Sequence, residues 1–252
     1  MTQKKITTIL FDCDNTLVLS ESLAFEASAD LTNEILASQN IPRRFTGPEL
    51  QTEFVGRSFE DMMKILAEMY DFKAPLSSAA LQHYANIEDE LVMAKLEQKL
   101  MPCDGANEVL SELVKDQTFH LAVVSGSALR RVRLSLEKAG QRAFFDADDV
   151  FSASCSLEWP VSKPDPAIYL HAMRSLRRVP QECVAIEDSR SGVISAREAG
   201  IRVVGYTGCH KERKDREAME RVLLEAGCSV IMDHWKDFEM CLEEIESMVH
   251  TG

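Results

Sequence analysis

Five short apolar segments recur along the chain, and each is followed by a turn or a polar cluster and then by a helical pattern. They are residues Ile6–Phe11, His120–Ser125, Cys183–Glu187, Ile201–Gly205 and Cys228–Met232. Nearly continuous apolar runs that alternate with helices are typical of a parallel sheet buried on both faces. We therefore expect an α/β fold, a doubly wound (Rossmann-like) parallel sheet core whose ligands bind at the carboxyl ends of the strands.

The stretch from about residue 20 to residue 100 departs from this alternation. It contains no convincing strand, whereas apolar residues recur there at helical spacing. Such stripes are usually the core of a helical bundle. One stripe consists of Phe59, Met62, Met63, Leu66, Met69 and Tyr70, and the other of Leu81, Tyr84, Ile87, Leu91 and Ala94. The sequence thus predicts an inserted α-helical cap domain at residues 19–101 and an α/β core domain at residues 1–18 and 102–252.

The charge balance excludes one class of function. The 252 residues include 41 Asp and Glu against 28 Lys and Arg, which gives a formal net charge of -13. A protein that binds nucleic acid without sequence preference needs a basic face, so we expect no nucleic-acid partner. An anionic substrate must then be held by a local positive site.

The sequence shows no secretion signal and no apolar window long enough to span a membrane. Its seven cysteines form no CxxC pair and have no nearby histidine partner, a pattern typical of reduced intracellular thiols. We therefore expect a cytoplasmic protein with no membrane association and no obligate protein partner.

Four polar clusters adjoin the predicted strands and helices. They are Asp12-Cys13-Asp14-Asn15-Thr16, Ser125-Gly126-Ser127, Lys163-Pro164-Asp165-Pro166, and Glu187-Asp188-Ser189 with Gly192. Each cluster alone is an ordinary turn or helix cap. Because strand ends converge on one crevice in a doubly wound sheet, their order along the chain favours a shared site.

Carboxylates crowded in a crevice repel one another unless a cation joins them. The oxygens of Asp12, Asp188 and a backbone carbonyl suit Mg²⁺, which also retains waters and a substrate phosphate. With the metal and Lys163 offsetting charge, Asp12 could attack phosphorus as a carboxylate nucleophile. The cluster therefore predicts a phosphate ester as substrate.

Two further roles complete this chemistry. Asp14 could protonate the leaving oxygen and later take a proton from the attacking water. Ser125 and neighbouring backbone N–H groups would hold the phosphate oxygens, because phosphoryl transfer depends mainly on positioning and charge stabilisation.

With these motifs in place, the chain resembles the haloacid dehalogenase superfamily hydrolases that carry a helical (C1-type) cap, in the phosphatase and β-phosphoglucomutase-like subgroup. The resemblance covers nearly the whole length. The family motif hhhDxDxT matches ILFDCDNT, the second motif matches Ser125, the basic third matches Lys163 in KPDPAIY, and the acidic fourth matches EDSRSG.

This resemblance implies a set of site residues. Asp12 would be the nucleophile and Asp14 the acid and base. Mg²⁺ would be bound by Asp12, the carbonyl of Asp14 and Asp188, with Glu187 at the metal or just beyond it. Candidates for contacting substrate are Cys13, Thr16, Gly126, Ser127 and, from the cap, Arg57.

One departure from the family pattern is Asn15, where many members carry Gly. Asn tolerates a left-handed conformation, so we expect the turn to be kept.

Other members of the superfamily offer alternatives. Asp14 disfavours dehalogenases and phosphonate hydrolases. The β-phosphoglucomutases that this chain resembles have an Arg three positions after a cap Gly, but here Val55-Gly56-Arg57-Ser58-Phe59 places Phe59 there, with Arg57 beside the glycine. This favours a phosphatase over a sugar-phosphate mutase, although Arg57 could reach a substrate or could simply start a helix at the surface.

A non-catalytic binding or regulatory module is the remaining alternative. Loss of the nucleophile, the acid/base or the acidic metal pair would be its signature, and all of these residues are present. We therefore expect a Mg²⁺-dependent phosphomonoesterase that acts on a small organic phosphate, with a sugar or polyol phosphate as the leading candidate, through an aspartyl-phosphate.

Overall fold

The computed structural model describes residues 6–54, 57–74, 76–159 and 161–249. The chain divides into two compact units, one formed by Met1–Leu19 with Met101–Gly252 and the other by Ser20–Leu100. Each of these boundaries lies one residue from the boundary expected from the sequence.

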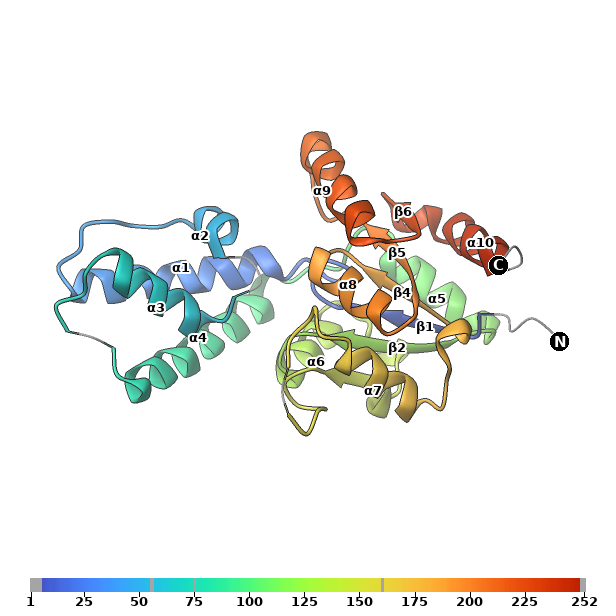
Figure 1. Cartoon of the computed structure of the whole chain (residues 1–252), viewed down its shortest axis with the longest axis horizontal. Coiled ribbons are helices and arrows are strands. Elements are labelled where there is room, and N and C mark those ends of the chain that lie inside the picture. The colour runs from blue at the N-terminus through green and yellow to red at the C-terminus, as the bar shows by residue number, and fades with distance from the viewer. Residues whose placement is uncertain (1–5, 55–56, 75, 160, 250–252) are drawn as a thin grey trace. The chain divides into compact units, whose positions relative to one another are not determined.

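A parallel sheet of six strands forms the centre of the first unit (Figure 1). The strands are β1 (Thr8–Phe11), β2 (His120–Ser125), β3 (Val150–Ser152), β4 (Cys183–Glu187), β5 (Arg202–Tyr206) and β6 (Val230–Met232). Their order across the sheet is β3-β2-β1-β4-β5-β6. The predicted α/β class is confirmed, and β1 lies between β2 and β4, so the segment that follows β1 starts at the middle of the sheet.

The helices of this unit follow the strands. They are α5 (Ala106–Asp116), α6 (Leu129–Lys138), α7 (Ala167–Ser175), α8 (Arg190–Glu198), α9 (Arg213–Ala226) and α10 (Phe238–Val249), with 3₁₀ turns η1 (Arg142–Phe144), η2 (Ala147–Asp149), η3 (Pro180–Glu182) and η4 (Trp235–Asp237).

The two faces of the sheet are both buried, as expected for parallel strands. On one face, Leu10 and Ala185 join a core cluster with residues of α7, α8 and α9. On the other face, Phe11 contacts the rings of Phe145 and Trp235, each at 5.9 Å between centroids. Adjacent side chains of β1 therefore enter opposite cores.

The second unit is helical and consists of α1 (Glu21–Ser38), α2 (Gly47–Phe54), α3 (Phe59–Met69) and α4 (Ser78–Lys99). Ser58 and Ser77 begin α3 and α4, and each side chain accepts a hydrogen bond from a backbone N–H three residues later. The second unit has a core cluster of its own, which includes Met62, Met63 and Leu66.

Three details differ from expectation. Ala94, expected in the bundle core, is exposed on α4, where the neighbouring Val92 and Leu96 are buried. Strand β3 was not predicted, because it is only three residues long and lies between 3₁₀ turn η2 and a turn, which leaves no alternating pattern to recognise. Met69, expected in the bundle core, is 56% exposed because it lies at the last turn of α3, where the apolar face is no longer covered.

Candidate active site

The parallel register places three of the predicted motifs at one edge of the sheet. Phe11, the last residue of β1, is paired with Val123 on one side and Ile186 on the other. Asp12, Ser125 and Glu187 therefore all stand at the carboxyl ends of neighbouring strands, and all three are buried.

Lys163 connects two of these carboxylates. Its Nζ lies 2.6 Å from Oδ1 of Asp12 and 2.6 Å from Oε1 of Glu187, and it also donates to the carbonyl of Val124 at 2.9 Å. The Lys163 side chain is only 7% exposed. The ammonium group is thus the local positive charge that the acidic composition required.

Glu187 is held by more than the lysine. The hydroxyl of Tyr169, which is fully buried, donates a short hydrogen bond to the same Oε1, and Nζ of Lys163 lies 5.2 Å from the centroid of the Tyr169 ring. Burial raises the pKa of Tyr169 well above its ordinary value, so the hydroxyl keeps its proton. Oε2 of Glu187 is buried and has no hydrogen-bond partner among the described residues.

Tyr169 was missed in the sequence analysis. It belongs to the quoted segment KPDPAIY, six positions after Lys163. It lies in the first turn of helix α7, which brings its side chain close to the lysine. An aromatic residue with a hydroxyl in an otherwise apolar helix start was the available signal.

Asp14 is held by the second motif. Its Oδ2 accepts hydrogen bonds from Oγ of Ser127 at 2.7 Å and from Oγ of Ser125 at 3.3 Å. Ser125 in turn accepts a bond from the backbone N–H of Ser127, and the Ser127 carbonyl accepts one from Ser152 of β3. Both serine hydroxyls therefore donate hydrogen bonds to Asp14. A Cβ at Gly126 would meet no atom within 4 Å, so the backbone between the serines faces open space.

Asp12 is followed directly by a tight turn, residues 13–18, which contains Asp14. Asn15 has φ +55°, the left-handed conformation that Asn was expected to tolerate. The hydroxyl of Thr16 donates to Oδ1 of Asp188 at 3.5 Å, which links this turn to the fourth motif. The Cys13 side chain is completely buried, and burial raises its thiol pKa well above the ordinary value. The Cys13 side chain is therefore not exposed to a substrate, and a contact through its backbone stays a prediction.

The charge balance of the site is unfavourable for an ionised nucleophile. Burial raises the pKa of Asp12 to about 8, the Lys163 ammonium opposes this rise, and the charges of Glu187 and Asp14 add to it. Burial lowers the pKa of Lys163, but pairing with Asp12 and Glu187 raises it above its usual range, so the lysine stays charged. More positive charge than one ammonium is needed to keep Asp12 ionised at neutral pH.

The same carboxylates form a group that fits a hard cation. Asp12, Glu187 and Asp188 each offer an oxygen, and these oxygens all lie within 4.8 Å of one another. The unpartnered Oε2 of Glu187 and the raised pKa of Asp12 agree with such a cation, because oxygen ligands of this kind suit Mg²⁺.

Arg57 belongs to the helical unit, where its side chain is exposed and its backbone N–H donates to the carbonyl of Phe54. The neighbouring Val55 and Gly56 of the quoted cap segment lie outside the described residues.

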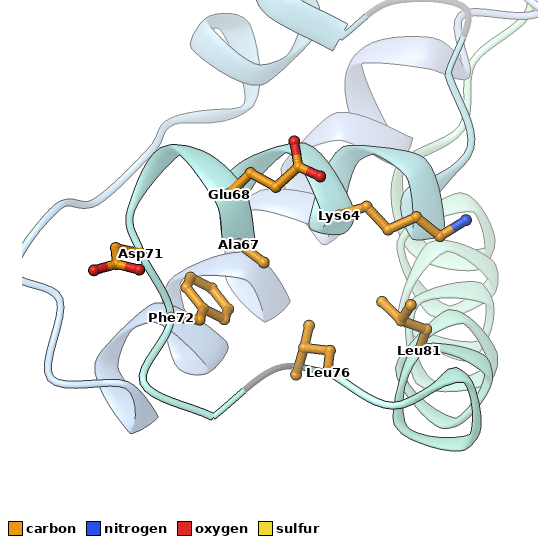
Figure 2. A pocket seen from close by; sticks show the side chains of 7 residues that line it. All are labelled: Lys64, Ala67, Glu68, Asp71, Phe72, Leu76 and Leu81. Atoms are coloured by element: carbon orange, nitrogen blue, oxygen red, sulfur yellow. The ribbon is translucent and has the colours of Figure 1, made fainter.

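The helical unit also has a pocket of about 300 Å³, shown in Figure 2. Apolar side chains of Phe72, Leu76 and Leu81 face its interior, while Glu68 and Lys64 extend from α3 near its edge. The full lining is Lys64, Ala67, Glu68, Asp71, Phe72, Leu76 and Leu81. None of the predicted site residues lines this pocket.

A model of the haloacid dehalogenase-like hydrolases matches residues 6–200. The chain belongs to this hydrolase family. The hydrolase is 28% identical over 225 residues to a phosphorylated carbohydrates phosphatase of Thermotoga maritima, covering 89% of this chain and 93% of that protein. It is 26% identical over 202 residues to a 6-phosphogluconate phosphatase of Escherichia coli, covering 79% of this chain and 81% of that protein.

The fold of the hydrolase also matches solved structures. A conserved haloacid dehalogenase-like protein of Agrobacterium tumefaciens superposes with a TM-score of 0.73 at 27% identity, over 94% of this chain and 98% of that one. The predicted family and enzyme class, a phosphatase of the haloacid dehalogenase type, are confirmed.

Among the residues that the structure describes, none of the helices combines the length and the apolar character that a membrane span requires.

Proposed function

We propose that this hydrolase removes phosphate from a small phosphorylated sugar or polyol by a two-step reaction through Asp12. The observation that carries the proposal is the ion-pair arrangement at the sheet edge, in which one buried lysine holds Asp12 and Glu187 at 2.6 Å each. A carboxylate fixed in this way, beside a second aspartate, suits covalent catalysis.

In the first step, an Asp12 carboxylate oxygen attacks phosphorus and the bond between phosphorus and the ester oxygen breaks. Asp14 gives its proton to the departing oxygen, which leaves as an alcohol. Lys163 offsets part of the negative charge that gathers around phosphorus. The product on the protein is an aspartyl-phosphate.

In the second step, water attacks phosphorus and Asp14, now a carboxylate, takes a proton from that water. The bond between phosphorus and the Asp12 oxygen breaks, so inorganic phosphate leaves and the carboxylate is restored. The hydroxyls of Ser125 and Ser127, with the N–H groups around Gly126, hold the phosphate oxygens once they turn from Asp14 toward the substrate. The backbone of Cys13 and Thr16 is assigned to the same binding region.

A magnesium ion fits the carboxylate group, and the residues that would hold it are Asp12, Asp188 and the carbonyl of Asp14, with Glu187 next to them. When bound, the ion would neutralise charge on the phosphoryl oxygens and on Asp12. The pairing of Glu187 with Lys163 and Tyr169 gives this carboxylate a second task, that of keeping the lysine in place.

The substrate class rests on the two relatives, which act on phosphorylated carbohydrates and on 6-phosphogluconate. We assign selectivity among such esters to the helical unit, as a cap, and assign Arg57 to the substrate, because its exposed guanidinium is suited to an anionic group. Location in the cytoplasm stays a prediction.

The test is phosphate release from a panel of sugar, polyol and nucleotide phosphates, with Mg²⁺ and with EDTA. Release from one sugar or polyol group that EDTA abolishes would support the proposal, and Asp12→Asn should remove it while the thermal unfolding profile stays cooperative. Near-normal turnover by that variant would rule out Asp12 as nucleophile. If no ester is hydrolysed, isomerisation of hexose 1-phosphates is assayed next, and activity there would replace hydrolysis by a mutase reaction.

A further inference from the structure

The turn at residues 13–18, which follows Asp12 and contains Asp14, is held at three successive carbonyl groups. The carbonyl of Asn15 accepts from Sγ of Cys103 at 3.6 Å, that of Thr16 from Nε1 of Trp235 at 3.2 Å, and that of Leu17 from Nε2 of Gln141 at 3.1 Å. The three donors come from distant parts of the chain. Most side-chain hydrogen bonds of this type cap helices or turns locally, so three long-range donors on one turn form a distinct arrangement.

The turn also has hydrogen bonds of its own. The N–H of Asn15 donates to the carbonyl of Val18 at 2.7 Å, and the N–H groups of Leu17 and Val18 donate to the carbonyl of Cys13 at 2.9 and 3.1 Å. These local bonds set the shape of the turn. The three side-chain donors fix its position on the sheet, together with the backbone N–H of Cys103, which also donates to the Leu17 carbonyl, at 2.9 Å.

Trp235 contacts the chain on both sides of the aspartates. Its indole ring lies 5.9 Å from the ring of Phe11, which immediately precedes Asp12, while its N–H reaches Thr16, two residues after Asp14. The ring is completely buried and also packs against Tyr206 and Phe238 at 5.6 and 6.0 Å. A side chain fixed at this many points is a rigid support for the segment between its two contacts.

Gln141 provides a second, independent support. It is completely buried, and its Nε2 also donates to Oδ1 of Asn107 at 2.8 Å. Asn107 donates its own amide N–H to the carbonyl of Ala139, which fixes the orientation of both amides. The amide of Gln141 is therefore directed at Leu17 by a chain of hydrogen bonds.

Thr16 transmits this support to the fourth motif. Its carbonyl is held by the indole, and its hydroxyl donates to Asp188. Movement at Thr16 would thus disturb both the turn that carries Asp14 and a carboxylate of the group that fits the cation.

We infer that Trp235 and Gln141 are positioning residues, which hold the turn at residues 13–18 so that Asp14 stays in place for proton transfer. The catalytic part of this inference rests on the function proposed above. Trp235 lies outside residues 6–200 that the family model matches, so this support is supplied by a part of the chain beyond that match.

The experiment compares Trp235→Phe, which keeps a ring but removes the N–H, with Trp159→Phe as a matched control. Trp159 is 78% exposed, so the same substitution there removes no buried contact. Gln141→Leu is the second test variant, and it serves if Trp235→Phe fails to fold. The first measurement is hydrogen–deuterium exchange at the amides of Asn15, Leu17 and Val18, which needs no substrate. The second is kcat and KM for p-nitrophenyl phosphate with Mg²⁺.

We expect those three amides to exchange about fivefold faster in Trp235→Phe and Gln141→Leu, the factor that one buried hydrogen bond contributes. We expect kcat to fall at least about fivefold with KM within about twofold, since a loosened turn lowers the competent fraction. Trp159→Phe should change neither quantity.

Unchanged exchange in both folded test variants overturns the inference whatever the activity. Faster exchange with unchanged kcat overturns the positioning role. If the unmodified protein hydrolyses no ester, the proposed function fails, and exchange still decides whether Trp235 and Gln141 hold the turn.

Discussion

Gly192 lies directly against the carboxylate of Glu187. A Cβ built at residue 192 would stand 1.7 Å from Oε2 and 2.2 Å from Cδ of Glu187, distances that no pair of non-bonded atoms can adopt. The glycine occupies the first turn of α8, where Ser189 accepts its backbone N–H. The position of the glutamate at the end of β4 therefore depends on the absence of a side chain at residue 192, five residues further along the chain.

Gly192→Ala should displace Glu187 and, with it, Lys163. Alanine normally favours a helix, but here overpacking should lower the free energy of unfolding by about 1–3 kcal/mol. Turnover should fall because Lys163 loses one of the two carboxylates that hold it beside Asp12. Urea unfolding and phosphate release measure the two effects, and adding Glu187→Asp, which shortens the carboxylate arm, should recover part of the stability. A Gly192→Ala protein as stable and active as the original would show that the contact is unimportant.

Tyr169→Phe should weaken the fixation of Glu187 while leaving the ring in place. Loss of a buried hydrogen bond to a charged acceptor should cost about 2 kcal/mol of unfolding free energy. Turnover should fall less than in Lys163→Met, because Lys163 still bridges both carboxylates at 2.6 Å. Denaturant titration and steady-state kinetics on the same preparations are the measurement. If Tyr169→Phe were as stable as the unmodified protein, that result would contradict the hydrogen bond assigned to the Tyr169 hydroxyl.

Asp14→Asn should separate the two chemical steps. p-Nitrophenolate leaves without help from an acid, so Asp12 can still be phosphorylated, whereas the second step lacks its base. Stopped-flow absorbance should show a burst of about one equivalent of p-nitrophenolate followed by slow turnover, the kinetic sign of a covalent intermediate. Asp12→Asn should show no burst. A burst in the Asp12 variant, or linear kinetics with the Asp14 variant at a normal rate, would reverse the assignments.

Arg57→Ala should raise KM for a sugar phosphate and leave kcat for p-nitrophenyl phosphate nearly unchanged. The reason is that Arg57 is assigned to binding of the substrate and takes no part in proton or phosphoryl transfer. Arg44→Ala, which removes another exposed arginine of the helical unit, is the matched control. An equal change of KM in both variants would point to general charge attraction instead.

His210 should make stability depend on pH. Burial lowers the pKa of His210, with Arg216 adding to this effect and Asp215 opposing it, and its Nε2 has no hydrogen-bond partner among the described residues. Below about pH 6.5 the unfolded chain binds a proton that the folded protein resists, so stability should fall as pH drops from about 6.5 to the lowered pKa.

His210→Gln tests this, with His83→Gln, at an exposed histidine, as its control. The difference in urea midpoint between pH 7.5 and 5.5 should shrink only in the first variant. The same difference in all three proteins would assign the pH dependence to other groups.

The sequence predicted those parts of the fold that have a local pattern. Residues His120–Ser125 and Cys183–Glu187 were expected as strands with the bounds that the structure has, because each is a nearly uninterrupted apolar run. Val150–Ser152 has too few residues for any period, so its place beside β2 had to come from tertiary pairing.

In the site, the order of the motifs along the chain predicted the residues proposed for catalysis. It did not predict the residues that hold their side chains and backbone in position. Asp12, Asp14 and Lys163 lie in short recognisable segments, and Glu187 ends an apolar strand. By contrast, Trp235 meets Thr16 across 219 positions of the chain, a contact that no local spacing encodes. The burial of Cys13 was also not predicted. A cysteine between two aspartates suggests a polar, exposed position, and only the structure shows that its side chain is buried at the end of β1.

The central place of β1 sets the order in which the protein can be completed. Thr8 pairs with His120 on one side and with Cys183 on the other, so the first strand to be synthesised has no neighbour until much of the chain has followed. At cellular translation rates, the ribosome needs on the order of ten seconds to translate the chain from Thr8 to His120. During that interval the four residues of β1, three of them apolar, remain unpaired, while the helical unit, whose apolar core lies within residues 20–100, can fold first. The nascent chain thus depends on protection of Thr8–Phe11 from contact with other chains until β2 has been synthesised.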